Sequence, residues 1–375
     1  MKLQRTNRLR AVAVGALAVS GALVLSACGS DDNSGGSGSD STTKAASKIK
    51  CGDEANLLAS GSSAQKNAMD IWTQTYQSAC SGTQINYKPT GSGAGIQEFL
   101  QGKTAFAGSD SALKPEEVAQ SKKVCKGGQG IDLPMVGGPI AVTYNVSGVD
   151  DLVLDAETMG KIFDSKITKW NDPEIKKLNP DAKLPGTKIQ AFHRSDESGT
   201  TDNFTKYLNS AAPEAWKHEP AKAWAGKGGQ GADGSSGIAT NVKQNDGAIG
   251  YVELSYAEGN ELNTAKLDTG ASDPVDATTD NASKAIADAK VTGKGKDLAL
   301  ELNYKTKSEG AYPIVLVTYE IACDKGNKKD SLEAMKSFLT YTASEDGQKT
   351  LSEKGYAPIP DEVIAKVRTT IDGLA

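Results

Sequence analysis

The segment from Phe192 to Phe204 has residue types that suit the binding of an anion. Arg194 follows the strand-like run 188–192, and Ser198, Gly199 and Thr200 open a helix with an apolar stripe. Ser198 suits the N-cap, and the unpaired N–H groups and dipole at a helix start favour negative charge. Arg194 would add a planar fork of donors for a tetrahedral oxyanion, and Asp196 could hold that fork in place. An ordinary helix cap with a surface salt bridge is the alternative for this segment alone.

Three other strand-like runs end in turns that carry similar chemistry. The turns are rich in glycine and serine and lie at 60–64, 90–95 and 108–110. The first two open helices, so each offers a hydroxyl and exposed N–H groups at a helix start. One such turn would be plain capping chemistry, but three of them with an arginine segment indicate a shared ligand side.

The elements that must position these turns alternate between strand and helix. Strand-like runs at 56–59, 84–87 and 104–107 are separated by helical patterns around Trp72 and Phe99. This βαβα alternation predicts a mostly parallel sheet with helices on its faces. Ligands of such sheets bind at the carboxyl ends of the strands, where the turns are.

A second α/β region lies between two strong strand-like runs, 139–144 and 311–319. It holds a helix at 156–162 capped by Asp155, the arginine segment and a strand at 248–252. Helical patterns at 332–341 and 362–371 should return to the first region. We therefore predict an α/β protein with two lobes, 50–140 plus 313–375 and 141–312. The two crossings would form a hinge, with the ligand cleft between the lobes.

The first residues have the pattern of an export signal. A basic stretch and an apolar run at 11–25 precede Leu25-Ser26-Ala27-Cys28, which resembles a bacterial lipobox. We predict a cleaved signal peptide at 1–27, a lipid on Cys28 that anchors the protein to the outer face of the cell membrane, and a Gly/Ser/Asp tether at 28–49. An ordinary secretory signal with a chance cysteine is the alternative. No other run is long and apolar enough to predict a transmembrane helix.

Net charge and cysteine content further restrict the ligands and sites that this protein can have. The chain of 375 residues has a net charge of −5, which becomes about −9 without the basic signal, so nucleic acid is a poor partner. An anion must then be held by local donors. Four cysteines beyond Cys28 allow three disulfide pairings. We favour Cys51 with Cys80 and Cys125 with Cys323, and their irregular spacing argues against a zinc site.

Several motifs together resemble the substrate-binding lipoprotein of the bacterial phosphate-specific ABC transporter. The resemblance runs from about Leu57 to the last helix and includes the lipobox and tether. The motifs are Thr90-Gly91-Ser92-Gly93-Ala94-Gly95, Ala107-Gly108-Ser109-Asp110, Lys166-Ile167-Thr168-Lys169-Trp170-Asn171-Asp172-Pro173, Arg194-Ser195-Asp196-Glu197-Ser198-Gly199-Thr200 and Asp246-Gly247-Ala248-Ile249-Gly250-Tyr251-Val252-Glu253.

The resemblance implies a type II periplasmic-binding-protein fold that closes on one inorganic phosphate. It implies these ligand residues: Ser63, Ala64, Ser92, Asp110, Arg194, Ser198, Gly199 and Thr200, with Asp196 orienting Arg194. Many relatives have Thr-Phe at Ser63-Ala64, so an aromatic wall is lost there. The implied partners are membrane permease subunits and a cytoplasmic ATPase. We expect a monomer that needs no metal or organic cofactor.

Asp110 would select among oxyanions. A carboxylate only accepts hydrogen bonds, and phosphate at neutral pH carries a P–OH that can donate to it. Sulfate has no such proton, and a mismatch of this kind can give roughly 10⁴-fold discrimination. The presence of Asp110 thus argues against a sulfate- or molybdate-binding protein, although arsenate shares the protonation of phosphate and would not be rejected.

A hydrolase that uses one of the many serines is the alternative from another class. Only His193 and His218 could supply an imidazole base, and the chain has no Gly-x-Ser-x-Gly elbow. A base positioned against a candidate serine is not evident from the sequence, so we expect a binding protein rather than an enzyme.

Overall fold

The computed structural model describes residues 48–352 and 354–375, which belong to one compact unit. The predicted signal peptide, the lipid on Cys28 and the predicted tether up to residue 47 lie outside these residues. Within the described ranges, no helix has the length and apolar character needed to cross a membrane.

The main sheet has the strand order β2-β1-β3-β13-β4-β8-β6-β7, with β9 beside β4. Its strands are β1 (Ala55–Gly61), β2 (Thr83–Lys88), β3 (Phe106–Ser109), β4 (Gly130–Asn145), β6 (Gln190–Arg194), β7 (Gln230–Ala232), β8 (Ala248–Glu253), β9 (Asn263–Thr264) and β13 (Val315–Cys323). Two small pairs lie apart from it: β5 (Val153–Asp155) with β10 (Lys266–Asp268), and β11 (Lys290–Val291) with β12 (Leu300–Glu301).

Helices connect most of these strands. They are α2 (Lys66–Ala79), α3 (Ser92–Leu100), α4 (Pro115–Ser121), α5 (Ala156–Phe163), α6 (Pro173–Leu178), α7 (Gly199–Ala211), α8 (Gly234–Gln244), α9 (Leu254–Gly259), α10 (Thr279–Ala287), α11 (Leu332–Thr342), α12 (Glu345–Ser352) and α13 (Asp361–Asp372). The predicted cap of α5 is confirmed, because Asp155 accepts a hydrogen bond from the Thr158 N–H at 2.7 Å.

The sheet is mixed rather than mostly parallel. β1 pairs in parallel with β2 and β3, and β6 pairs in parallel with β7 and β8, as the alternation predicted. The central pairs β3–β13, β13–β4 and β4–β8 are antiparallel. The difference has two sources. β13 lies between β3 and β4 and runs against both of them, and β4 in turn runs against β8.

Two hydrophobic cores lie along this sheet and define two lobes. The first core packs Leu57 and Trp72 with Phe338 and Ile364, so the C-terminal helices lie on the first lobe. The second core includes Trp170 and packs around the strands β6 and β8. α10 lies within the predicted range of the second lobe, yet its apolar side chains pack in the first core. The residues that move with each lobe therefore stay a prediction.

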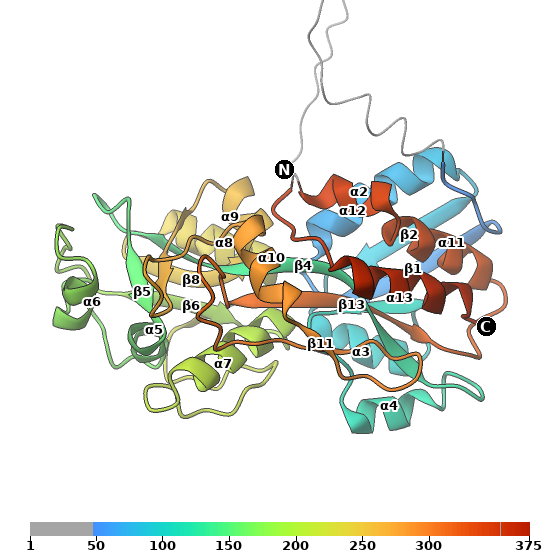
Figure 1. Ribbon diagram of the computed structural model, residues 1–375, viewed down its shortest axis with the longest axis horizontal. Coiled ribbons are helices and arrows are strands. Elements are labelled where there is room, and N and C mark those ends of the chain that lie inside the picture. The colour runs from blue at the N-terminus through green and yellow to red at the C-terminus, as the bar shows by residue number, and fades with distance from the viewer. Residues whose placement is uncertain (1–47, 353) are drawn as a thin grey trace, which may run out of the picture. The chain divides into compact units, whose positions relative to one another are not determined.

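β4 is the element that the two lobes share. Its first part, up to Pro139, pairs with β13, and its last part, from Ile140, pairs with β8 (Figure 1). The Ile140 N–H donates to the Ile314 carbonyl at 2.7 Å, so the outgoing and returning crossings lie side by side. Two adjacent extended segments are the kind of connection about which lobes can rotate.

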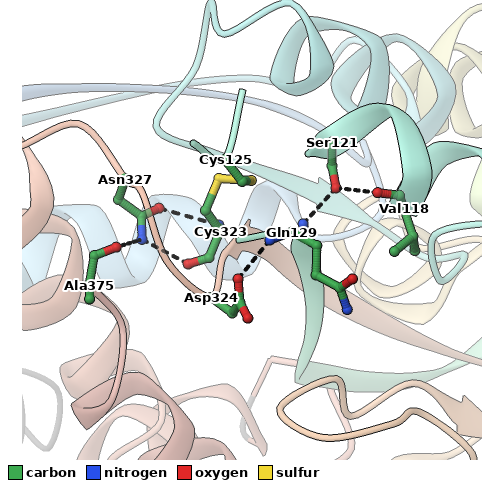
Figure 2. The surroundings of a disulfide bond; sticks show 9 residues. Val118, Ser121, Cys125, Gln129, Cys323, Asp324, Asn327 and Ala375 are labelled. Carbon is green, nitrogen blue, oxygen red and sulfur yellow. Dashed lines mark hydrogen bonds between the residues drawn. A yellow bond between two sulfur atoms is a disulfide. The ribbon is translucent and has the colours of Figure 1, made fainter. Parts of the chain in front are cut away.

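Two disulfides have the favoured pairing, Cys51–Cys80 and Cys125–Cys323. Figure 2 shows the second one, which ties the segment after α4 to the end of β13. Beside it the Gln129 N–H donates to Asp324 at 2.7 Å, and the Asn327 amide donates to the Cys323 carbonyl at 2.7 Å. The end of β13 is thus held by covalent and polar contacts together.

The two disulfides should contribute unequally to stability. They join residues 29 and 198 positions apart. In the chain-entropy model, closing loops of these lengths stabilises the fold by about 4 and about 5 kcal/mol. We expect Cys125→Ala/Cys323→Ala to lower the free energy of unfolding in urea more than Cys51→Ala/Cys80→Ala does. The reverse order would show that loop length does not govern their contributions.

Candidate functional site

Arg194 and Asp196 form a buried ion pair at the end of β6. Nε and Nη2 of Arg194 donate to Oδ1 and Oδ2 of Asp196 at 2.7 Å and 2.5 Å. Only 2% of the Arg194 surface is exposed. The pair uses two of the five guanidinium N–H donors, and no acceptor in the described residues pairs with Nη1. Asp196 therefore fixes the guanidinium and leaves donors for a further group.

The start of α7 lies next to this arginine. Ser198 is the N-cap, as predicted, and its Oγ accepts a hydrogen bond from the Thr201 N–H at 3.2 Å. The Gly199 N–H and the Thr200 hydroxyl instead point to the first lobe. They donate to Ser92 Oγ at 3.1 Å and to Asp110 Oδ2 at 3.3 Å. The predicted residues of both lobes thus meet in one cluster.

Asp110 directly follows β3 and is buried in this cluster. Three hydroxyls donate to its carboxylate: Ser62 and Thr318 to Oδ1, and Thr200 to Oδ2. Each carboxylate oxygen can accept about two hydrogen bonds. Oδ1 is therefore fully occupied by described residues, whereas Oδ2 keeps one free acceptor position.

Opposing effects act on the pKa of Asp110. Burial is the larger effect and raises the pKa above its ordinary value, while the hydrogen bonds from Ser62 and Thr318 and the charge of Arg194 lower it in part. The three hydroxyls donate hydrogen bonds, and an ionised carboxylate only accepts them. The groups around Asp110 therefore suit its ionised form.

Ser92 opens α3 and links the two lobes. Its Oγ accepts from the Asp110 N–H at 3.2 Å and from the Gly199 N–H at 3.1 Å. Both lone pairs of the hydroxyl are then used, so its proton remains free to donate. A Cβ on Gly199 would lie 2.6 Å from the Asp110 Cβ, so only glycine permits this close approach.

The turn at Ser63 and Ala64 has partners that the sequence did not indicate. Ser63 Oγ lies 3.0 Å from Ser235 Oγ in the second lobe and accepts a hydrogen bond from the Ser235 N–H at 3.0 Å. The Ala64 N–H donates to Ser62 Oγ at 3.1 Å. The role of Ala64 as a ligand donor stays a prediction, because Ser62 already occupies its N–H.

Five residues of this cluster were not singled out from the sequence: Ser62, Asn203, Ser235, Tyr251 and Thr318. Asn203 donates to the Asp110 carbonyl at 2.7 Å, and the Tyr251 hydroxyl accepts from the Arg194 N–H at 3.2 Å. Thr318 gave one available signal, because it is the one serine or threonine within the strand β13. Ser235 gave another, since Asp233-Gly234-Ser235 is again a glycine and serine turn that opens a helix.

The two histidines are engaged away from the serines. His193 Nδ1 lies 3.0 Å from the Arg194 carbonyl oxygen and its ring stacks on Trp224, and His218 Nε2 lies 2.8 Å from Asp164. Burial also lowers the pKa of His193. In the described residues neither imidazole forms a hydrogen bond with a serine hydroxyl, and no group of three or more acidic, histidine or cysteine side chains is placed to hold a metal ion.

Glu320 is a second buried carboxyl on the same strand as Thr318. It is fully buried, and among the described residues neither of its oxygens accepts a hydrogen bond of normal geometry, nor does Oε1 of the neighbouring Gln65. Burial raises the pKa of Glu320 well above its ordinary value; the Gln65 amide lowers it in part and Asp110 raises it further. A protonated Glu320 could donate to Gln65 Oε1, so the neutral acid suits this position.

The charge state of Glu320 should appear in the pH dependence of stability. A folded pKa above the unfolded one stabilises the protein below the unfolded pKa, near 4.5. That stability is lost as pH rises toward the folded pKa. We expect Glu320→Gln, which cannot ionise, to gain stability relative to the unchanged protein between pH 4 and pH 8. Urea unfolding at both pH values tests this, and a difference that stays constant with pH would contradict a neutral Glu320.

Comparison with known proteins defines first the class of this protein. A family model described as a PBP superfamily domain matches residues 35–346. The fold agrees with that of a high affinity periplasmic phosphate-binding protein bound with phosphate, PfluDING (TM-score 0.68, 22% identity, 84% of this chain and 93% of that chain). It also agrees with a phosphate binding protein from Stenotrophomonas maltophilia (TM-score 0.64, 19% identity, 84% and 93%). The two-lobe α/β architecture is thus the periplasmic-binding fold.

The sequence then identifies the family within this class. The chain is 46% identical to "Phosphate-binding protein PstS 3" of Mycobacterium tuberculosis (strain ATCC 25618 / H37Rv) over 378 residues, which cover 100% of both chains. The chain therefore belongs to the PstS family of phosphate-binding proteins.

Proposed function

We propose that this protein binds inorganic phosphate in the cluster around Asp110 and Arg194 and delivers it to an ABC importer. The observation that carries the proposal is the pairing of two buried groups. Asp110 keeps one free acceptor position, and Arg194, which lies near enough to lower the pKa of Asp110, keeps free donors. An anion that also carries a proton matches both groups at once, and phosphate is such an anion at neutral pH.

The remaining donors of the cluster suit the other phosphate oxygens. Ser92 has both lone pairs occupied, so its O–H is available to the ligand. Among the described residues Ser198 Oγ accepts only the Thr201 N–H, which leaves the Ser198 proton available to the ligand. The N–H of Thr200 lies in the first turn of α7, where N–H groups have no partner within the helix. Together with Arg194, these groups would surround the anion with charge-assisted hydrogen bonds.

Binding without catalysis is the second part of the proposal. The relatives are named as binding proteins, and the two histidines that could act as a base are held by Asp164 and by the Arg194 carbonyl. The protein would act as a monomer without metal or organic cofactor. Arsenate has the same protonation as phosphate and should compete for the site.

The lobes would open and close about the paired crossings near Ile140 and Ile314, with the boundaries 50–140 plus 313–375 and 141–312 as the starting assignment. Because α10 packs in the first core, we propose that it moves with the first lobe. A lipid on Cys28 would hold the protein at the extracytoplasmic face of the cell membrane. There it would meet the permease subunits, which work with a cytoplasmic ATPase.

The choice between phosphate and sulfate tests the role of Asp110. By calorimetric titration at neutral pH, phosphate should bind roughly 10⁴-fold more tightly than sulfate. Asp110→Asn should weaken phosphate binding and strengthen sulfate binding, because the amide can donate to an unprotonated oxygen. Asp181→Asn, at an exposed aspartate, is the matched control. Sulfate binding as tight as phosphate binding in the unchanged protein would refute the role of Asp110.

Removal of Arg194 tests the site itself. Truncating one partner of a buried, charge-assisted contact costs about 2–5 kcal/mol, so Arg194→Ala should weaken phosphate binding by roughly 10²-fold or more. Arg194→Lys keeps the charge but loses the planar fork. Its phosphate affinity should therefore lie between those of the unchanged protein and Arg194→Ala. Unfolding curves show whether each variant is folded. Phosphate affinity that survives Arg194→Ala would place the binding site elsewhere.

A further inference from the structure

The first turn of α8 contacts the site through residues that are not among the proposed phosphate ligands. It lies in the second lobe, yet the Ser235 N–H and hydroxyl both reach Ser63 Oγ in the first lobe, each at 3.0 Å. The two serines are 172 positions apart in the sequence and both are buried. The adjacent Gly234 N–H donates to Oδ1 of Asp196 at 3.3 Å. One helix start thus contacts both the Ser63 turn and the carboxylate that holds Arg194.

The Ser63 hydroxyl has a small, fixed number of hydrogen-bonding positions. Its oxygen has two acceptor positions and one proton. The Ser235 N–H fills the first acceptor position. If the Ser235 hydroxyl fills the second, the Ser63 proton is free to donate to a third group. An anion beside Ser63 favours this arrangement, because a hydrogen bond to a charged acceptor is stronger than one between two neutral hydroxyls.

Ser92 shows the same arrangement with different partners. Its two acceptor positions are filled by the Asp110 N–H and by the Gly199 N–H, which belongs to the second lobe. In both cases a serine of the first lobe accepts an N–H from the first turn of a second-lobe helix, α7 or α8. These N–H groups lack partners within their own helices, so they are available for the contact.

We infer that Ser235 is a positioning residue for the anion. When the lobes close, it fills the acceptor positions of Ser63 and turns the Ser63 proton toward phosphate. This inference rests on the proposed function and assigns Ser235 no contact with the ligand. Closing would then do more than exclude water, since it would set the donor direction of a hydroxyl that is otherwise free to rotate.

A neighbouring contact holds the Ser63 backbone from the same side. The Tyr256 hydroxyl donates to the Ser63 carbonyl at 2.9 Å, and Tyr256 lies in α9 of the second lobe. Ser63 is thus held at its backbone by α9 and at its side chain by α8. The Ser63 turn thus has close polar contacts with two helices of the second lobe.

A double-mutant cycle on the full chain tests the inference. Phosphate affinity is measured by calorimetry for the unchanged protein, Ser235→Ala, Ser63→Ala and the double variant. One hydrogen bond of this type contributes about 0.5–1.5 kcal/mol. Ser235→Ala should therefore weaken phosphate binding by about two- to twelvefold, mainly through faster dissociation in stopped-flow measurements. In the Ser63→Ala background the same change should have almost no further effect.

Two further variants separate positioning from a structural role. Ser235→Thr keeps the hydroxyl and should retain most of the affinity. Ser236→Ala changes the exposed neighbouring serine and should leave phosphate binding unchanged. Thermal unfolding without phosphate should not follow the affinity changes, because the contact acts on the ligand-bound, closed form.

The outcomes distinguish this inference from the proposed function. If Arg194→Ala and Ser63→Ala weaken phosphate binding but Ser235→Ala does not, the phosphate site stands and the role of Ser235 is refuted. An equal loss from Ser235→Ala with and without Ser63 would also refute it, because Ser235 would then not act through Ser63. If Ser63→Ala has no effect, both the ligand role of Ser63 and the positioning role of Ser235 are refuted.

Discussion

A charged carboxylate is stable inside a protein only if other groups replace the water that it loses, and Asp110 imposes this requirement on the fold. Its three hydroxyl donors come from three separate elements: the turn after β1, the strand β13 and the first turn of α7. The sheet order β1-β3-β13 places the first two on either side of β3, the strand that Asp110 directly follows. The third comes from the other lobe and is available only when the lobes are close together.

The charges of the cluster show why local donors matter more than net charge. Arg194 is neutralised by Asp196, and Asp110 is a further acidic group in the cluster, so no surplus of positive charge attracts an anion. The whole chain is acidic as well. Binding therefore has to come from oriented N–H and O–H groups in a water-poor space, where each hydrogen bond to a charge is stronger than in water. The same orientation penalises an anion whose pattern of protons does not match.

Contacts between the lobes in this cluster join polar groups whose partners lie far away in the sequence. The Gly199 N–H has its acceptor in the first lobe, and the Ser63 hydroxyl accepts its hydrogen bond from the second. Asn203 adds a further link, from its amide to the Asp110 carbonyl. If the lobes separated, water would form hydrogen bonds with these groups in place of their lost partners. The free energy of closing is therefore small, and one bound ion can shift the equilibrium between open and closed forms.

The sequence by itself determined the local features of this protein. Hydrophobic periodicity predicted the strands β1, β2, β3, β6 and β8 and the helices α2, α3, α5, α7, α11 and α13. The Ser198 and Asp155 caps and the glycine and serine turns were predicted from residue type and position, and the candidate ligand residues followed from motif resemblance. These features depend on neighbours within a few residues, which the sequence displays directly. Only the tertiary structure decided the antiparallel centre of the sheet, the packing of α10 in the first core and the partners of Asp110 and Ser63. Thr318 and Ser235 are 208 and 172 positions from those partners, and no local pattern encodes which distant hydroxyl will meet a buried oxygen.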